Sequence, residues 1–248
     1  MKKFGLIGHP IAHSLSPALF KAAYDGKYAY DLIEGEDFET SYRRFAEEYN
    51  AINVTAPFKE PAFSKADILS EECKATGATN LLVKTPEGIK AYNSDFLGVR
   101  MWLSEVAEDL KGVKILIVGL GGAGKAAAAA AESLGMEVIR MNRTVRDSTT
   151  HPLDEFRQYF QEADIIIYNI PTAIPELKEL TESDFAADRP KHILEANYKD
   201  PSMAEILKPF GSKAVYTGGR TWLLYQAVTG YEILTGEKPD LRRMSDVL

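Results

Sequence analysis

The sequence has few of the features that mark secreted, membrane-embedded or metal-binding proteins. Cys73 is its single cysteine, so no intrachain disulfide can form and a reducing compartment is allowed. No window approaches the ~18 apolar residues of a membrane span. The N-terminal apolar run, residues 4–7, is too short for a signal peptide. We therefore expect a cytoplasmic protein with no membrane partner.

An excess of positive charge is missing as well. Lysine and arginine number 29 against 36 acidic residues, which makes the net charge −7, so a nucleic-acid partner is not expected. The four histidines are scattered without the spacing of a metal site, and we expect no metal. What remains is a chain of 248 residues with ordinary composition, long enough for one large core or two modest ones.

Strand-like apolar runs alternate with helix-like periodic segments along the whole chain. This alternation is typical of an α/β fold built from βαβ units with a mainly parallel sheet. We place a domain boundary near residue 98, where an expected helix leads out of the first domain, and we expect the last helix, residues 221–234, to return to that domain. The expected strands are residues 4–7, 28–33, 51–55, 79–84, 88–92, 114–118, 137–141, 163–169, 192–196 and 213–216, and the other expected helices include residues 17–24, 38–48 and 94–109.

The octapeptide at residues 53–60 combines an amide, a hydroxyl and an amine in Asn53, Thr55 and Lys59. It follows a buried strand, and Pro57 stiffens the turn by restricting φ. Open α/β sheets place their ligands at such strand ends. The segment therefore predicts part of a polar ligand site.

Other short polar residues stand before expected helices. Ser14 and Ser16 flank Leu15, and two hydroxyl groups beside free N–H groups suit a carboxylate ligand, although Ser16 also fits a helix N-cap. Asn80 follows a turn, and Asp95 fits either a cap or a catalytic group. An amine can donate a proton to a carbonyl being reduced, and a nearby carboxylate can hold that amine. We choose Lys59 and Asp95 as this pair.

A glycine-rich loop begins directly after the expected strand at residues 114–118. Gly119, Gly121 and Gly124 match the dinucleotide-binding pattern, with an apolar strand before them and an alanine-rich helix after them. The glycines permit a tight turn, a close approach of the pyrophosphate and close packing of helix on strand. The phosphates are expected at the free N–H groups near Gly122 and Ala123.

The end of the next strand favours NADP over NAD. NAD enzymes place a carboxylate there to bind the ribose 2′-hydroxyl. This chain has Asn142, Arg143 and Thr144 instead. Arg143 can bind a 2′-phosphate with two hydrogen bonds, and Thr144 can add another donor.

Taken together, these motifs resemble the shikimate dehydrogenase family from end to end. They are Gly8-His9-Pro10-Ile11-Ala12-His13-Ser14-Leu15-Ser16-Pro17, Asn53-Val54-Thr55-Ala56-Pro57-Phe58-Lys59-Glu60, Gly77-Ala78-Thr79-Asn80, Asn93-Ser94-Asp95, the glycine loop, Asn142-Arg143-Thr144 and Gln226-Ala227. The resemblance implies a substrate-binding domain at residues 1–97, completed by residues 222–248, and an NADP-binding Rossmann domain at residues 98–221. It also implies reversible NADPH-dependent reduction of 3-dehydroshikimate to shikimate, in the chorismate route to aromatic amino acids.

The resemblance also assigns roles to residues of this sequence. Lys59 and Asp95 fall on the catalytic positions of the family. Its substrate-binding positions correspond to Ser14, Ser16, Thr55, Asn80, Tyr198 and Gln226. Its cofactor positions correspond to Gly119, Gly121, Gly122, Ala123, Gly124, Asn142, Arg143 and Thr144.

Two segments depart from the family pattern. Residues 169–175 replace a stretch of small residues, and Thr221 and Trp222 replace a Gly-Met pair, so that Trp222 either meets the nicotinamide or packs internally. The alternatives are therefore a dehydrogenase for quinate or a related cyclic polyol acid, and a non-catalytic nucleotide-binding homologue. A monomer or a homodimer is expected.

Overall fold

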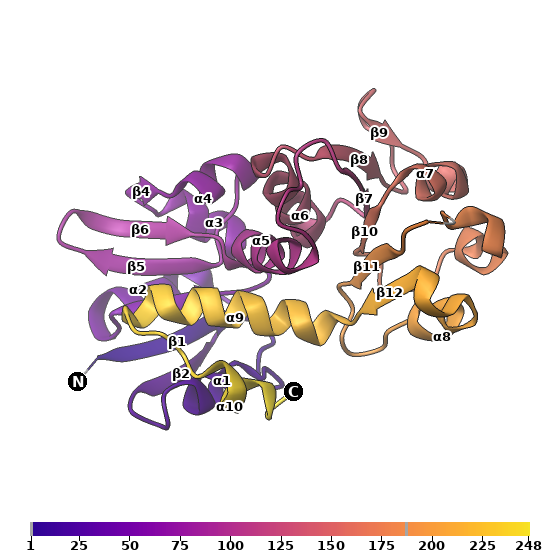
Figure 1. Cartoon of the computed structure of the whole chain (residues 1–248). Coiled ribbons are helices and arrows are strands. Elements are labelled where there is room, and N and C mark those ends of the chain that lie inside the picture. Colours follow the sequence, from indigo (N-terminus) through magenta and orange to yellow (C-terminus); the bar gives the residue numbers. More distant parts are fainter. Residues whose placement is uncertain (1, 187) are drawn as a thin grey trace. The chain divides into compact units, whose positions relative to one another are not determined.

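The computed structural model describes residues 2–186 and 188–248, which form two compact units. Unit 1 contains the chain up to Gly98 together with Leu224–Leu248, and unit 2 is Val99–Leu223. The chain leaves unit 1 within helix α5 (Ser94–Val106) and returns to it within α9 (Gly219–Thr235), which can be followed by colour in Figure 1. Each unit has its own β-sheet flanked by helices, so the expected α/β class with two domains is confirmed.

The sheet of unit 1 is mixed, with the order β2-β1-β3-β5-β6-β4. Strand β1 lies parallel between β2 and β3, whereas β5 is antiparallel to both β3 and β6. The strands are β1 Lys3–Gly8, β2 Ala29–Glu34, β3 Ala51–Val54, β4 Ile68–Leu69, β5 Leu81–Thr85 and β6 Gly88–Tyr92. The other helices of the unit are α1 Ser16–Ala23, α2 Phe38–Glu48, α3 Lys59–Ser64, α4 Glu71–Thr76 and α10 Leu241–Ser245.

Strand β3 divides its side chains between the two faces of this sheet. Ile52 and Val54 belong to a buried cluster with Phe38 and Phe45 of α2. Because side chains alternate along a strand, Asn53 points to the opposite face. A second cluster of this unit is aromatic and includes Phe20 of α1 and Tyr231 of α9.

The sheet of unit 2 is entirely parallel, with the order β12-β11-β10-β7-β8-β9. Its strands are β7 Lys114–Val118, β8 Glu137–Met141, β9 Thr150–His151, β10 Ile165–Tyr168, β11 Lys191–Glu195 and β12 Ala214–Thr217. Its α-helices are α6 Gly122–Ser133, α7 Phe156–Glu162 and α8 Ala204–Leu207, and its 3₁₀ turns are Leu153–Glu155, Pro175–Glu179, Glu182–Asp184 and Lys208–Lys213.

The strand order of unit 2 reverses between β7 and β10. Their ends are joined by a hydrogen bond of 2.8 Å from the Asn169 N–H to the Val118 carbonyl oxygen. Ligands of open α/β sheets bind at such a reversal point. Behind it, the six alanines 126–131 of α6 are buried, and their small side chains allow the helix to lie close to the sheet.

Several local predictions were wrong. Ser16 is not an N-cap: it begins α1 after the N-cap Leu15, and its N–H donates to Ser14 Oγ at 3.2 Å. Lys59 begins the short helix α3, which was expected as a turn. The two-residue strands β4 and β9 were not expected, since they carry no periodic pattern.

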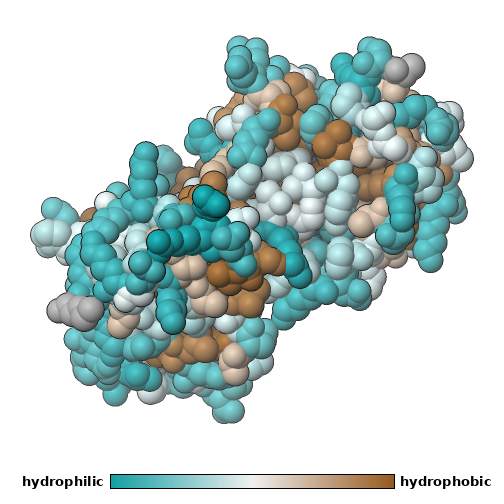
Figure 2. Space-filling view, turned by 60° about the horizontal axis from the view of Figure 1, so that its bottom comes forward, coloured by the Kyte–Doolittle hydropathy of each residue, from teal (hydrophilic) through white to brown (hydrophobic). Residues whose placement is uncertain are grey.

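Hydrophilic side chains cover most of the face drawn in Figure 2, with hydrophobic patches between them. No helix within residues 2–186 and 188–248 combines the length and apolar character needed to cross a bilayer.

Candidate active site

Lys59 and Asp95 meet in unit 1. Lys59 Nζ lies 2.7 Å from Asp95 Oδ2, and the two residues come from the first turns of α3 and α5. The lysine side chain is 32% exposed and the aspartate side chain 13% exposed. The predicted contact between ammonium and carboxylate is therefore present, with the ammonium still within reach of water.

The start of α5 holds Asp95 in place through its neighbours. Asn93 Oδ1 accepts the Phe96 N–H at 3.2 Å, so Asn93, and not Asp95, caps the helix. Asn80 Oδ1 accepts the Ser94 N–H at 2.8 Å, and Asn80 Nδ2 donates to Ser94 Oγ at 3.1 Å. The buried Asn80 side chain thus positions the residue before Asp95.

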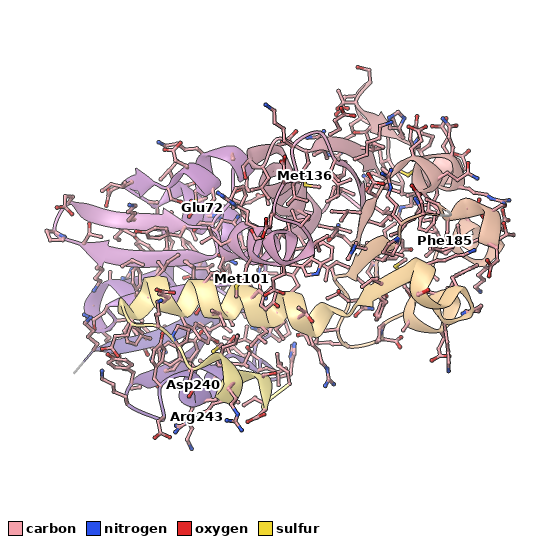
Figure 3. All side chains as sticks on the ribbon, in the orientation of Figure 1. Glu72, Met101, Met136, Phe185, Asp240 and Arg243 are labelled. Carbon is pink, nitrogen blue, oxygen red and sulfur yellow. The ribbon has the colours of Figure 1, made fainter. Side chains whose placement is uncertain are left out.

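A longer chain of contacts supports this corner of the unit. The Asn93 N–H lies 3.5 Å from Glu72 Oε1 on α4, which is labelled in Figure 3. The Asn93 side-chain amide donates to Thr76 Oγ1 and to the Ala78 carbonyl oxygen, both at 3.1 Å. These hydrogen bonds therefore join the turn before Asn80 to the start of α5.

The two serines form a small hydroxyl pair after β1. Ser14 Oγ and Ser16 Oγ are 3.1 Å apart, and both side chains are partly exposed. At the start of α1, Ser14 Oγ accepts the Ser16 N–H at 3.2 Å, and Pro17 has no N–H group. The arrangement offers two hydroxyl groups and a positive helix end to an anionic ligand group.

Glycines allow the backbone to pack closely beside Thr55 and beside Gln226. A Cβ atom at Gly8 would lie 2.4 Å from Thr55 Cγ2, so the ends of β1 and β3 touch there. A Cβ atom at Gly98 would lie 2.7 Å from the Gln226 backbone nitrogen, so α5 and α9 pack backbone against backbone. Both polar side chains are partly buried.

Tyr198 lies in unit 2, on the loop after β11. The loop is organised by Asn197, whose Nδ2 donates to the Pro171 and Asp200 carbonyl oxygens at 2.9 and 2.6 Å. The buried carboxylate of Glu195 accepts the Ser202 N–H at 2.6 Å and the Tyr216 hydroxyl at 2.7 Å. Tyr198 is therefore presented by a well-connected loop.

The glycine loop has the geometry of a phosphate site. Gly119 has φ +87°, which favours glycine, and a Cβ atom at Gly124 would lie 1.9 Å from the Gly119 carbonyl oxygen. Gly121 and Gly122 are exposed, and a Cβ atom at either would meet nothing within 4 Å. Gly121 is the N-cap of α6 and has no side chain to occupy the N–H groups. The loop and the partly buried Ala123 leave these donors open to a phosphate.

Asn142 ties this loop to the end of β8. Its Oδ1 accepts the Leu120 N–H at 3.3 Å, and its Nδ2 donates to the Thr144 carbonyl oxygen at 3.2 Å. Arg143 and Thr144 are exposed beside it. Asp147 Oδ1 accepts hydrogen bonds from Thr149 Oγ1 at 2.7 Å and Thr150 Oγ1 at 3.1 Å, which turns that oxygen toward its own loop.

The segments that depart from the family pattern are both in unit 2. Trp222 is buried with 5% of its surface exposed, and Thr221 is partly buried. Asn169 follows β10, and its buried Oδ1 has no hydrogen-bond partner in the described part of the chain.

Two tyrosines outside the predicted set also approach these residues. The Tyr30 hydroxyl donates to Asn53 Oδ1 at 2.7 Å, and the Tyr231 hydroxyl donates to the Ser16 carbonyl oxygen at 3.1 Å. No sequence motif marks these tyrosines; the sheet register places Tyr30, and the packing of α9 places Tyr231. Within residues 2–186 and 188–248, no group of three His, Cys, Asp or Glu side chains is arranged to hold a metal ion.

Two family models match the chain. Residues 6–82 match the shikimate dehydrogenase substrate binding domain. Residues 94–194 match the NAD binding domain of D-isomer specific 2-hydroxyacid dehydrogenases. The two matches follow each other along the chain.

Full-length relatives and a solved structure agree with these matches. A shikimate dehydrogenase (NADP(+)) of Natronomonas pharaonis is 31% identical over 100% of this chain and 98% of its own length. One of Caldanaerobacter subterraneus subsp. tengcongensis is 30% identical over 95% and 92%. The structure of shikimate 5-dehydrogenase from Thermus thermophilus in complex with NADP(H) and shikimate has a TM-score of 0.78 and 25% identity, covering 100% of this chain and 98% of that one. The chain belongs to the shikimate dehydrogenase family.

Proposed function

We propose that this protein is an NADP-dependent shikimate dehydrogenase, which reversibly reduces 3-dehydroshikimate to shikimate in the chorismate route to aromatic amino acids. The proposal is carried by the 2.7 Å contact between Lys59 and Asp95, which directly follows the Ser94 residue held by Asn80. The chain matches these relatives over nearly their whole length, and they are named shikimate dehydrogenase (NADP(+)). Membership of the family therefore supports the same substrate and cofactor.

Reduction of a ketone needs a hydride and a proton. NADPH, when bound, supplies the hydride. Lys59 Nζ, as an ammonium, donates a proton to the oxygen that becomes the hydroxyl group, and Asp95 holds the ammonium by a charge-assisted hydrogen bond. Because the lysine is one-third exposed, water can return the proton after each turnover. In the reverse direction Lys59 accepts the proton from the hydroxyl group.

Five further residues of unit 1 are assigned to the substrate. We assign the Ser14 and Ser16 hydroxyl groups to the substrate carboxylate, because the N-terminal end of α1 adds a positive field there. Thr55, Asn80 and Gln226 are assigned to the ring hydroxyl groups. We also assign Tyr198 of unit 2 to the substrate. Unit 1 is then the substrate domain, and unit 2 the nucleotide domain.

The residues of unit 2 fit NADP. The exposed Gly121 and Gly122, at the open start of α6, would hold the pyrophosphate. Asn142 in place of a carboxylate leaves no negative charge at the end of β8 to repel a 2′-phosphate. Exposed Arg143 and Thr144 would bind that phosphate.

One assay with purified protein tests the proposal. We expect oxidation of shikimate with NADP, and loss of about 100- to 10,000-fold in kcat for Lys59→Ala, the range of general acid–base catalysis. An unchanged melting temperature for the variant would show that its fold is kept. Absence of turnover by the wild type with shikimate and either nucleotide would overturn the assignment.

The second candidate is a dehydrogenase for quinate or another cyclic polyol acid, which the replacement of the family's Gly-Met pair by Thr221 and Trp222 favours. A substrate panel ranked by kcat/KM decides between the two, and shikimate in first place removes the alternative. Tight NADP binding without turnover of any member would instead favour a non-catalytic nucleotide-binding protein.

Location and assembly remain predictions. We infer a cytoplasmic enzyme from its single cysteine, Cys73, a buried thiol whose pKa is raised by that burial to about 11. We expect a monomer or a homodimer, which sedimentation of the purified protein would distinguish.

A further inference from the structure

Two tyrosine hydroxyl groups lie in the aromatic cluster around Phe20 in unit 1. Tyr30 of β2 and Tyr231 of α9, the tyrosine pair, pack against Phe20 of α1, with ring centroids 4.6 and 4.9 Å away. The two tyrosine rings are 6.1 Å apart. Phenylalanine would fill the same space, so packing alone does not require hydroxyl groups here. Buried hydroxyl groups are costly unless they are hydrogen-bonded.

Both hydroxyl groups are engaged with residues of the candidate site. Tyr30 reaches past β1, the strand between β2 and β3, and donates to Asn53 Oδ1 at 2.7 Å. Tyr231 donates to the Ser16 carbonyl oxygen at 3.1 Å. Burial raises the pKa of both hydroxyl groups well above the usual tyrosine value, so they stay protonated and act as donors.

The hydrogen bond from Tyr30 decides how the Asn53 amide is oriented. With Oδ1 turned to the tyrosine, the two N–H donors of Nδ2 point away from it. They donate to no acceptor among the described residues, and Asn53 is partly exposed. Asn53 stands two residues before Thr55 at the end of β3, so its donors are available to a ligand at that edge.

The hydrogen bond from Tyr231 acts on Ser16 at the start of α1. Ser16 is the first residue of α1, and its hydroxyl group is paired with Ser14 Oγ at 3.1 Å. Fixing the Ser16 carbonyl oxygen from α9 fixes the start of α1. Helix α9 therefore sets the position of the serine pair.

We propose that Tyr30 and Tyr231 are positioning residues for the substrate: Tyr30 orients the Asn53 amide as a hydrogen-bond donor to the polyol acid, and Tyr231 fixes Ser16. This inference rests on the proposed function and adds to it a second layer of residues.

The test compares Tyr30→Phe and Tyr231→Phe with a matched control, Tyr24→Phe. Tyr24 packs on the same Phe20 ring, at 5.1 Å, but its hydroxyl group bonds Thr235 Oγ1 and the Glu237 carbonyl oxygen at 2.9 and 3.0 Å. We expect the KM for shikimate to rise about threefold to tenfold in the first two variants, the effect of one lost hydrogen bond, with the KM for NADP unchanged. Tyr24→Phe should keep both KM values.

A double-mutant cycle tells positioning from a merely structural effect. If Tyr30 acts through Asn53, then Tyr30→Phe has almost no further effect on the shikimate KM in an Asn53→Ala background. Asn53→Ala alone leaves the ring cluster intact and should raise this KM at least as much as Tyr30→Phe does. Additive effects, or a wild-type KM in Asn53→Ala, overturn the inference.

The activity of the wild type distinguishes a failure of the proposed function from a failure of this inference alone. A wild type that does not oxidise shikimate overturns the proposed function and the inference with it. A wild type that is active, with tyrosine variants indistinguishable from Tyr24→Phe, overturns the inference alone.

Discussion

Substitution of Gly121 by alanine gives a sharp test of the nucleotide site, because the folded chain itself has room for the new methyl group. Gly121 has φ −68° and ψ −171°, an extended conformation open to any residue, and a Cβ atom there meets nothing within 4 Å. The substitution should leave the fold intact and change its stability by less than about 1 kcal/mol, because the lower entropy of the unfolded chain offsets the poorer N-cap that alanine makes.

Binding of the nucleotide should respond in the opposite way. If the pyrophosphate approaches the backbone at Gly121, the methyl group occupies that space and a charge-assisted hydrogen bond is lost. Such a bond contributes about 1.5–3 kcal/mol, which corresponds to a dissociation constant raised roughly 10- to 100-fold.

Gly124→Ala is the informative contrast. Its Cβ atom would lie 1.9 Å from the Gly119 carbonyl oxygen and 2.9 Å from the Gly119 carbonyl carbon, both backbone atoms that cannot move aside cheaply. We expect a cost near the upper end of overpacking, about 3 kcal/mol or more, and a melting temperature lowered by roughly 10 °C.

Titration of NADPH fluorescence and thermal denaturation of the three proteins provide the measurement. Wild-type affinity for NADPH in a well-folded Gly121→Ala protein would refute the assigned approach of the pyrophosphate. A Gly124→Ala protein as stable as the wild type would refute the packing argument.

Three further predictions concern single side chains. Asp95→Asn removes the carboxylate 2.7 Å from Lys59 Nζ and should lower kcat by at least about tenfold, since the ammonium loses its charged partner; steady-state kinetics with an unchanged kcat would contradict the pairing. Arg143→Ser should raise the KM for NADP about 10- to 100-fold and leave that for NAD nearly unchanged; equal effects on both nucleotides would remove Arg143 from the 2′-phosphate site. Asp184 is buried, which opposes its ionisation, but hydrogen bonds from Arg157, Gln161 and Thr181 hold its pKa at about 2. Its ionised form therefore stabilises the fold above the ordinary pKa of 3.8, and this stability is lost as the pH falls toward about 2. Asp184→Asn should lower the free energy of unfolding by roughly 2 kcal/mol at neutral pH and flatten its pH dependence between about pH 4 and pH 2. Urea unfolding at several pH values measures this dependence, and the same pH dependence in both proteins would speak against this role.

Much of the architecture was predictable because it depends on local pattern. Apolar runs alternate with periodic segments, which predicts an α/β fold, and Gly119-x-Gly121-x-x-Gly124 follows a strand and opens a helix as expected. The strands without a pattern of their own, β4 and β9, were missed because each has only two residues and forms by pairing with a neighbour.

Local chemistry also has limits at the level of single groups. Ser16 has the residue type of an N-cap, but the hydroxyl group of Ser14 accepts its N–H and the helix starts one residue early. Asp95 fits a cap equally well, but Asn93 takes that role. Residue type restricts such alternatives, and the three-dimensional neighbours select among them.

The sequence by itself determined the kinds of chemical groups present and the periodic patterns of the strands and helices, because both depend on residues close together in the chain. Only the tertiary structure decided which distant groups meet. Tyr30 and Asn53 are 23 residues apart, and Ser16 and Tyr231 are 215 apart. Strand register and helix packing bring such pairs within hydrogen-bond distance, and a shift of one residue along a strand would turn Tyr30 and Asn53 to the other face of the sheet.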